Sequence, residues 1–210
     1  MPMTKEEKFA KKYIMTELSK QGYPTYANLL SYFDFNFTSD PSVVAFMEPS
    51  TGRIVVNRGL DEEQVSVVIR HEILHNYLKH EDRLLKKLSD ETGVDYSTLT
   101  DTEFKDLNKK LKDELYSNTD FNYAADYEIS NLAYTDRDKE TIKQINVNGE
   151  ILRGLVTEDD HPDWVELSVE EMYDELRKER LKKVDSPSRY MGRLINGRTF
   201  VDMNGVVYGV

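Results

Sequence analysis

The most informative stretch of this chain for its fold and its site is His71-Glu72-Ile73-Leu74-His75. Residues i and i+4 of a helix lie one turn apart on the same face, so the two imidazoles can point at one metal ion. Glu72 lies about 100° further round the helix, where its carboxylate can reach a water molecule beside that ion. The spacing therefore predicts two metal ligands and a general base on one helix.

The residues around this stretch predict that it lies inside a helix. Asp61–Gln64 supplies an N-cap, two acidic first-turn residues and a glutamine at the third helical position. Apolar residues follow at helical spacing, namely Val65, Val68, Ile69, Ile73 and Leu74. Neither glycine nor proline interrupts 61–92, so we expect one helix that continues through His80 to about Leu88. The alternative is that His71 and His75 are polar residues on a partly exposed helix.

The composition of the chain excludes several kinds of site. It has 210 residues, no cysteine and a formal net charge of −11. Without cysteine, a metal must be held by histidine and carboxylate. The acidic balance argues against a nucleic-acid partner, because phosphate contacts need clustered lysine and arginine. No apolar run can span a bilayer and no signal-peptide core is visible, so we expect a cytoplasmic protein with no membrane partner.

The segment before the motif helix has the pattern of a small antiparallel sheet. Aromatic and polar residues alternate over Ser31–Phe37, and Val43–Phe46 is a second strand candidate. A turn at Pro49–Gly52 then leads to a third strand, Arg53–Asn57. An edge strand of such a sheet can bind an extended peptide by strand addition. The sheet can also simply cover one side of the motif helix, and these two interpretations do not exclude each other.

Capping patterns and turn residues predict the remaining elements. Helices are expected from Thr4 to about Lys20, from Thr100 to about Leu115 and from Ser168 to about Lys183. A hairpin is expected over Thr141–Val156, with Asn148-Gly149 as its turn.

These elements predict a simple domain organisation. Residues 1–185 are expected to form one domain, and 186–210 a C-terminal β-hairpin or tail. Within the domain, 83–116 is rich in charge and is interpreted as a solvated helical insertion. The alternative for this insertion is a lid over a cleft.

A catalytic zinc site takes three protein ligands and keeps one position for water, so the two histidines leave one ligand to be found. A helix predicted from Asn118 to about Tyr134 carries Asn122 and Asp126 on one face, with small residues between them. We expect Asp126 to be the third ligand. The alternative is that Asp126 hydrogen-bonds a ligating histidine without touching the metal.

The histidine nearest to the motif is His80. On a continuous helix it would lie about 180° from His71 and about 140° from His75, so it would face away from the metal. We therefore expect His80 to pack or to form a hydrogen bond locally.

Other polar residues are candidates to support the site. A developing oxyanion needs a hydrogen-bond donor, and Tyr127, Tyr134 and His161 are available for this role. Asn122, Tyr127 and His161 are expected to support either a ligand or the oxyanion. The alternative for His161 is a solvated histidine in an acidic loop.

Taken in order, these residues resemble a bacterial and phage metallopeptidase-domain family that in many relatives is coupled to a von Willebrand-like domain. The shared pattern is a strand that ends in Asn, then H-E-x-x-H with a further His, an Asn-x-Ala-x-Asp helix and a Ser-x-Glu-Glu-x-Tyr helix start. The resemblance covers roughly residues 40 to 180, and these residues carry it: Asn57, His71, Glu72, His75, His80, Asn122, Ala124, Ala125, Asp126, Ser168, Glu170, Glu171 and Tyr173.

The resemblance implies a minimal zincin-like α+β domain, mainly helical, with a small antiparallel sheet beside the active-site helix. It implies one Zn²⁺ per chain on His71, His75 and Asp126, with Glu72 as general base, in a protease that hydrolyses a peptide or protein substrate. Two features depart from this pattern. The insertion 83–116 is long, and Asn122 stands where gluzincins have a glutamate ligand. The alternatives are a non-catalytic metal-binding or protein-interaction module with the same fold, and a regulatory protein without a metal.

Overall fold

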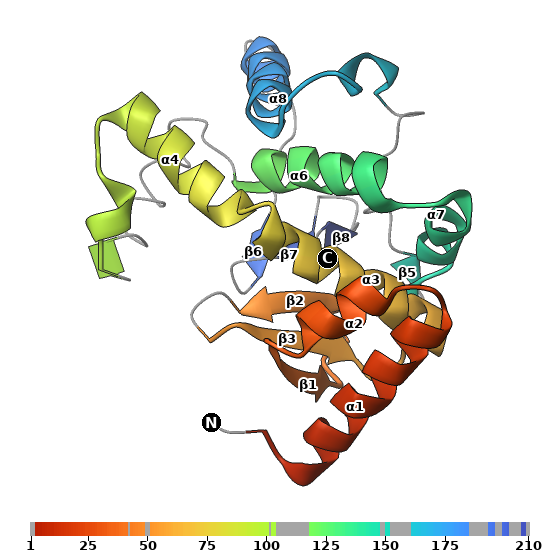
Figure 1. Cartoon of the computed structure of the whole chain (residues 1–210). Coiled ribbons are helices and arrows are strands. Elements are labelled where there is room, and N and C mark those ends of the chain that lie inside the picture. Colours follow the sequence, from red (N-terminus) through yellow and green to blue (C-terminus); the bar gives the residue numbers. More distant parts are fainter. Residues whose placement is uncertain are drawn as a thin grey trace. The chain divides into compact units, whose positions relative to one another are not determined.

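The chain is described from a computed structural model as two compact units (Figure 1). The described residues are 3–41, 43–48, 51–100, 102–103, 118–147, 150–151, 161–184, 193–195, 199–201 and 207–208. The first unit contains Met1–Tyr77, Tyr134–Leu155 and Gly192–Val210, and the second contains Leu78–Ala133 and Val156–Met191. The structure is mainly helical with a small sheet, which confirms the predicted α+β class.

Two helices open the first unit. Helix α1 (Lys5–Lys20) begins with the predicted capping box, in which Thr4 and Glu7 each accept a hydrogen bond from the other's backbone N–H. Its last turn leads through Gly22, whose φ of 92° lies in the left-handed region that glycine adopts easily. Helix α2 (Pro24–Leu30) follows directly.

The sheet of the first unit is mixed, so the predicted antiparallel arrangement is wrong. Its strands are β1 (Asp34–Thr38), β2 (Ala45–Glu48) and β3 (Arg53–Asn57), in the order β1-β3-β2. Strand β3 pairs parallel with β1 and antiparallel with β2. The last four residues of β3 are all buried, which is typical of a central strand covered on both faces. After β1 the chain therefore crosses to the far edge of the sheet before a hairpin returns it to the centre.

Asn57 joins the end of β3 to the segments beside it. Its side chain is 6 % exposed and donates from Nδ2 to the carbonyls of Asp40 at 2.9 Å and Val43 at 2.6 Å. Its Oδ1 accepts the backbone N–H of Gly59 at 2.8 Å. Three hydrogen bonds from one buried amide thus fix the chain just before the motif helix.

We expect Asn57→Ala to lower the free energy of unfolding by about 2–3 kcal/mol, because each lost hydrogen bond contributes about 1 kcal/mol. Urea unfolding followed by circular dichroism measures this change. The matched control is Asn28→Ala on the exposed face of α2, for which we expect a change within about 0.5 kcal/mol. Equal effects of the two substitutions would show that the three hydrogen bonds contribute nothing specific.

Helix α3 (Glu62–Tyr77) carries the H-E-x-x-H stretch and begins where the sequence predicts. The Gln64 N–H donates to Asp61 Oδ1 at 2.9 Å, and Gln64 Oε1 accepts the Asp61 N–H at 3.1 Å. The helix is buried without interruption from Val65 to Ile73, so it is the central helix of the first unit. It packs in one apolar cluster with the sheet, α1, α2 and α7.

The predicted continuation of this helix to Leu88 is wrong. Helix α3 ends at Tyr77, and a separate helix, α4 (His80–Thr92), begins in the second unit (Figure 1). The break lies at Lys79, whose φ of 57° is left-handed. This conformation costs a residue with a Cβ atom about 1–2 kcal/mol. Neither glycine nor proline marks the break, and after it α4 packs against α6 and α8 within the second unit.

The first unit also contains α7 (Asp136–Lys143) and two small sheets. Part of the predicted hairpin 141–156 is wrong, because Thr141–Lys143 forms the end of α7. The described pairing is between β4 (Asn146–Val147) and β5 (Glu150–Ile151), and the predicted turn residues lie outside the described residues. The capping box between Thr135 and Asp138 favours a helix at this point, so Thr141–Lys143 ends a helix and does not begin a strand.

The C-terminal segment contains three short antiparallel strands. They are β6 (Arg193–Ile195), β7 (Thr199–Val201) and β8 (Val207–Tyr208), with β7 in the centre. Strands β6 and β7 pair antiparallel, and the expected hairpin or tail over 186–210 stays a prediction. The predicted division at residue 185 stays a prediction.

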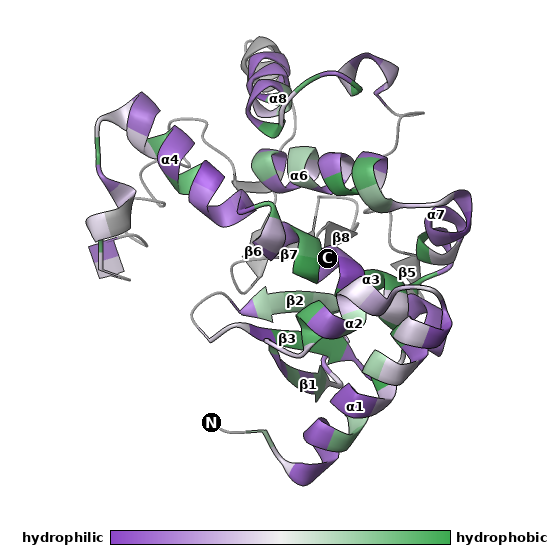
Figure 2. Cartoon of the chain, in the orientation of Figure 1, coloured by the Kyte–Doolittle hydropathy of each residue, from purple (hydrophilic) through white to green (hydrophobic). Residues whose placement is uncertain are grey.

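The second unit is helical. Its longer elements after α4 are α6 (Asn118–Ala133) and α8 (Val169–Val184), with short 3₁₀ turns at Tyr96–Thr98 and Pro162–Trp164. An apolar cluster joins α6 and α8, formed by Phe121, Ala124, Ala125, Tyr127, Trp164, Val169, Met172 and Tyr173. Figure 2 shows α4 and α8 as mainly hydrophilic helices interrupted by hydrophobic residues.

Two more predicted helix starts are found in this unit. The Ser168 N–H donates to Glu171 Oε2 at 2.9 Å, and the Thr100 N–H donates to Glu103 Oε2 at 2.9 Å. Most of the helix predicted after Thr100 lies outside the described residues. In the part of the chain that the structure describes, no helix is long and apolar enough to cross a bilayer.

Candidate metal centre

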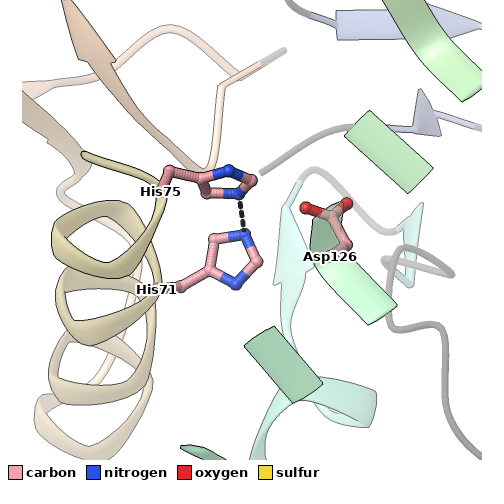
Figure 3. A group of neighbouring side chains, drawn as sticks. All are labelled: His71, His75 and Asp126. Atoms are coloured by element: carbon pink, nitrogen blue, oxygen red, sulfur yellow. Dashed lines mark hydrogen bonds between the residues drawn. The ribbon is translucent and has the colours of Figure 1, made fainter. Parts of the chain in front are cut away.

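The two motif histidines face each other on α3. Their Nε2 atoms are 2.8 Å apart, drawn as the dashed line in Figure 3, and the ring centroids are 4.5 Å apart. Two nitrogens bound to one tetrahedral zinc ion lie about 3.3 Å apart, so a small ring movement would suit a shared ion. His71 is 2 % exposed, which does not fit the alternative of polar side chains on a partly exposed helix.

The other ring nitrogen of His71 has a partner in the same unit. Tyr134 Oη lies 2.6 Å from His71 Nδ1. Tyr134 stands between α6 and α7, directly before the N-cap of α7. The sequence indicated Tyr134 as a possible oxyanion donor, whereas the structure places its hydroxyl against a candidate ligand.

Glu72 lies buried beside His71 in the chain. Its side chain is 3 % exposed, and among the described residues its Oε1 has no hydrogen-bond partner. Burying a carboxylate oxygen without a partner costs free energy. A buried polar atom of this kind in a folded protein calls for a water molecule, an ion or a functional role. Two imidazoles whose Nε2 atoms face each other are suited to hold a metal ion, and a carboxylate oxygen without a protein partner is suited to interact with water.

Arg70, the residue before His71, belongs to a buried ion pair that no sequence pattern indicates. Arg70 donates to both carboxylate oxygens of Asp138, at 2.5 Å and 3.3 Å, and its guanidinium carbon lies 3.8 Å from the centre of the Tyr23 ring. Burial alone would raise the pKa of Asp138, but hydrogen bonds from Arg70 and Thr135 outweigh burial and lower that pKa. The carboxylate is therefore held in its charged form.

Asp126 lies on α6 of the second unit and is 7 % exposed. Figure 3 draws it together with His71 and His75. The structure thus brings the two histidines together within one unit, while Asp126 comes from the other unit. Its role as third ligand stays a prediction, and so does any supporting role of the partly buried Asn122 on the same helix.

The remaining predicted supports, Tyr127 and His161, contact each other in the second unit. Tyr127 Oη donates to the His161 carbonyl at 2.9 Å. The His161 ring stacks on Trp164 with centroids 3.7 Å apart, and its Nε2 lies 3.3 Å from Tyr123 Oη. His161 is therefore packed against aromatic rings while its side chain stays partly exposed. Support for a ligand or for the oxyanion stays a prediction.

His80 is buried and forms a hydrogen bond within the second unit, but its partner, Glu128, lies 48 residues away in the sequence. His80 is 4 % exposed, and its Nε2 lies 2.7 Å from Glu128 Oε2, which also accepts from Arg83 at 2.9 Å. Burial alone would raise the pKa of Glu128, and its contacts with His80 and Arg83 lower it overall. The prediction placed His80 on a continuation of the motif helix, facing away from the metal. That placement was wrong, because His80 begins the new helix α4.

Comparisons with known proteins add nothing to this site. No protein-family model, no curated protein and no solved structure matches the chain. The residues of the chain itself therefore have to support any functional proposal.

Proposed function

We propose that this chain is a zinc-dependent metallopeptidase with a minimal zincin-like fold, which hydrolyses peptide bonds in a peptide or protein substrate. The observation that supports this most is the buried Glu72, whose Oε1 has no partner among the described residues. It stands directly after His71, whose Nε2 faces that of His75 at 2.8 Å. A structural role for Glu72 would call for a partner at this oxygen, whereas a general base needs it available for a water molecule.

The proposed metal ligands are His71, His75 and Asp126. The proposal requires the Asp126 carboxylate on α6 to reach an ion held between the two histidines of α3, and Figure 3 draws these three side chains. Histidine and carboxylate are suitable zinc ligands, and three protein ligands leave a fourth position for water. This is the ligand number of catalytic zinc sites, whereas structural sites use four protein ligands.

The proposed reaction is the hydrolysis of an amide by water. A bound zinc ion would polarise the substrate carbonyl and make the attacking water more acidic. Glu72 accepts a proton at Oε1 from that water while the water oxygen bonds to the carbonyl carbon. Glu72 then passes the proton to the amine nitrogen as the C–N bond breaks, so the base returns to its charged form. His71 and His75 would hold the metal ion on the same helix that carries the Glu72 carboxylate.

The second candidate is a non-catalytic metal-binding or protein-interaction module with the same fold. Asn122 favours it, because a neutral amide stands at the position where gluzincins carry a glutamate ligand. The number of protein ligands discriminates the two candidates. X-ray absorption at the zinc edge is expected to show three protein ligands and one water oxygen for the peptidase, and four protein ligands for a structural site.

We expect the chain, purified without a histidine tag and without added zinc, to contain about one zinc ion per molecule. Inductively coupled plasma mass spectrometry measures the zinc content. His75→Ala and Asp126→Ala should each reduce zinc retention by at least about tenfold, because each removes one of three ligands. Glu63→Gln, on the exposed first turn of α3, is the matched control and should retain zinc. Wild-type protein that neither contains zinc nor binds it on titration would overturn the proposal.

A further inference from the structure

The contact between Tyr134 and His71 lies within the first unit and is tightly defined. Tyr134 Oη is 2.6 Å from His71 Nδ1, and the two rings are 6.1 Å apart with an interplanar angle of 30°. The Tyr134 side chain packs against the apolar cluster around α3. A phenol oxygen can either donate or accept a hydrogen bond, so this contact can occur with either ring nitrogen of His71 protonated.

The position of the proton decides whether His71 can bind a metal at Nε2. A neutral imidazole carries one N–H, and a ligating nitrogen must keep its lone pair. If Nδ1 carries the proton and donates to Tyr134, the lone pair lies on Nε2, the atom that faces His75. Ligating histidines commonly donate their other N–H to a fixed acceptor in this way, which sets both tautomer and ring orientation.

Hydrogen bonds of the residues that follow Tyr134 hold the chain next to it in place. Thr135, the next residue, is the N-cap of α7, and its N–H donates to Asp138 Oδ2 at 3.0 Å. Asp138 in turn accepts two hydrogen bonds from the buried Arg70. Arg70 and His71 are neighbours on α3, so two consecutive side chains of one helix reach the start of α7 at two points. The residue after Tyr134 is therefore held to α7, and α7 is held to α3, at the point where the phenol oxygen meets Nδ1.

We infer that Tyr134 is a positioning residue that holds His71 with its proton on Nδ1 and its Nε2 lone pair directed at the metal, and that the Arg70–Asp138–Thr135 contacts fix Tyr134 in this place. The inference rests on the proposed metal site and assigns within it a role that the sequence did not indicate. Tyr134 then acts through His71 and not as an oxyanion donor.

Tyr134→Phe in the full chain tests this role through zinc affinity. Loss of the hydroxyl is expected to weaken zinc binding by about 10–100-fold, the range found when a hydrogen-bonding partner of a metal ligand is removed. Competition with a chromophoric chelator measures the affinity. Tyr13→Phe is the matched control, because Tyr13 donates its phenol hydrogen bond to Glu62 at the opposite end of α3. We expect its zinc affinity to equal that of the wild type.

A second measurement separates positioning from a general structural role. Nitrogen-15 NMR of the metal-free chain reports which ring nitrogen of His71 is protonated. The wild type is expected to show the Nδ1–H tautomer, and Tyr134→Phe is expected to lose this preference, whereas Tyr13→Phe keeps it. The Nε2–H tautomer in the wild type would overturn the inference without any variant.

The outcomes for zinc distinguish the inference from the proposed function. Wild-type protein that binds no zinc overturns the metal site and, with it, this role of Tyr134. Wild-type protein that binds zinc while Tyr134→Phe keeps the same affinity and the same His71 tautomer overturns the role of Tyr134 alone.

Discussion

Glu72→Gln is expected to abolish peptide-bond cleavage while leaving the zinc content of the protein unchanged. Glutamine has nearly the same shape but cannot take a proton from the attacking water, and general-base catalysis contributes about 10²–10⁴-fold to a rate. Cleavage of a fluorescently labelled, unfolded casein measures the loss. The substitution replaces one of the two carboxylate oxygens by an NH₂ group and removes the negative charge of a side chain whose Oε1 has no partner among the described residues.

The same substitution has an expected effect on stability that a structural role would not produce. A buried carboxylate with an unpartnered oxygen is costly, and a neutral amide of equal size reduces that cost. We therefore expect the thermal unfolding midpoint of metal-free Glu72→Gln to equal or exceed that of the wild type. Glu63→Gln, exposed on the same helix, should keep the activity and lower the midpoint only by what its exposed ion pair with Arg137 contributes to stability, about 0–1 kcal/mol. Cleavage by Glu72→Gln at the wild-type rate would refute the mechanism.

Arg70→Met is expected to destabilise the protein by about 3–5 kcal/mol, because it leaves the Asp138 carboxylate buried without its cation. Asp138 is 4 % exposed, and its charge is favoured by the hydrogen bonds that lower its pKa. Methionine replaces the length and apolar volume of the arginine stem, so the lost charge dominates the change. Urea unfolding measures the difference in free energy.

The chain provides a matched control for this prediction. Arg137 of α7 pairs with Glu63 of α3, so it joins the same two helices as Arg70 and Asp138, but its side chain is 78 % exposed. Exposed ion pairs contribute about 0–1 kcal/mol, which is the loss we expect for Arg137→Met. The double variant Arg70→Met/Asp138→Asn should recover part of the stability, because no lone charge remains buried. Equal losses for the two arginine variants would contradict this account.

The parts of the fold that local chemistry determines could be predicted from the sequence. Thr4, Asp61 and Ser168 each begin a helix because the capping partner lies three residues further on. The same pattern at Thr135 and Asp138 marks the start of α7. The parallel pairing of β1 with β3 and the helix break at Lys79 depend on contacts between distant segments, and no single residue type signals them.

In the candidate site, too, local patterns could be predicted and contacts between distant segments could not. His71 and His75 could be found because a spacing of four residues brings them to one helix face, and Glu72 because it lies within the same turn. Tyr134 lies 63 residues from His71, and Asp138 lies 68 residues from Arg70. Neither contact has a pattern that can be read along the chain, since each depends on how α7 packs on α3. Asp126 was predicted from its helix face, and its role as ligand awaits the zinc measurements.

The early end of α3 at Tyr77 also has an electrostatic consequence. The aligned peptide dipoles of a helix give its C-terminus a partial negative charge of about half an electron, and this field is felt within the last turn. His75 lies in that last turn, so the backbone itself attracts a cation to the place where the two imidazoles meet. Such attraction is worth about 0.3–1 kcal/mol. A helix that continued to Leu88 would have carried this negative pole about three turns away.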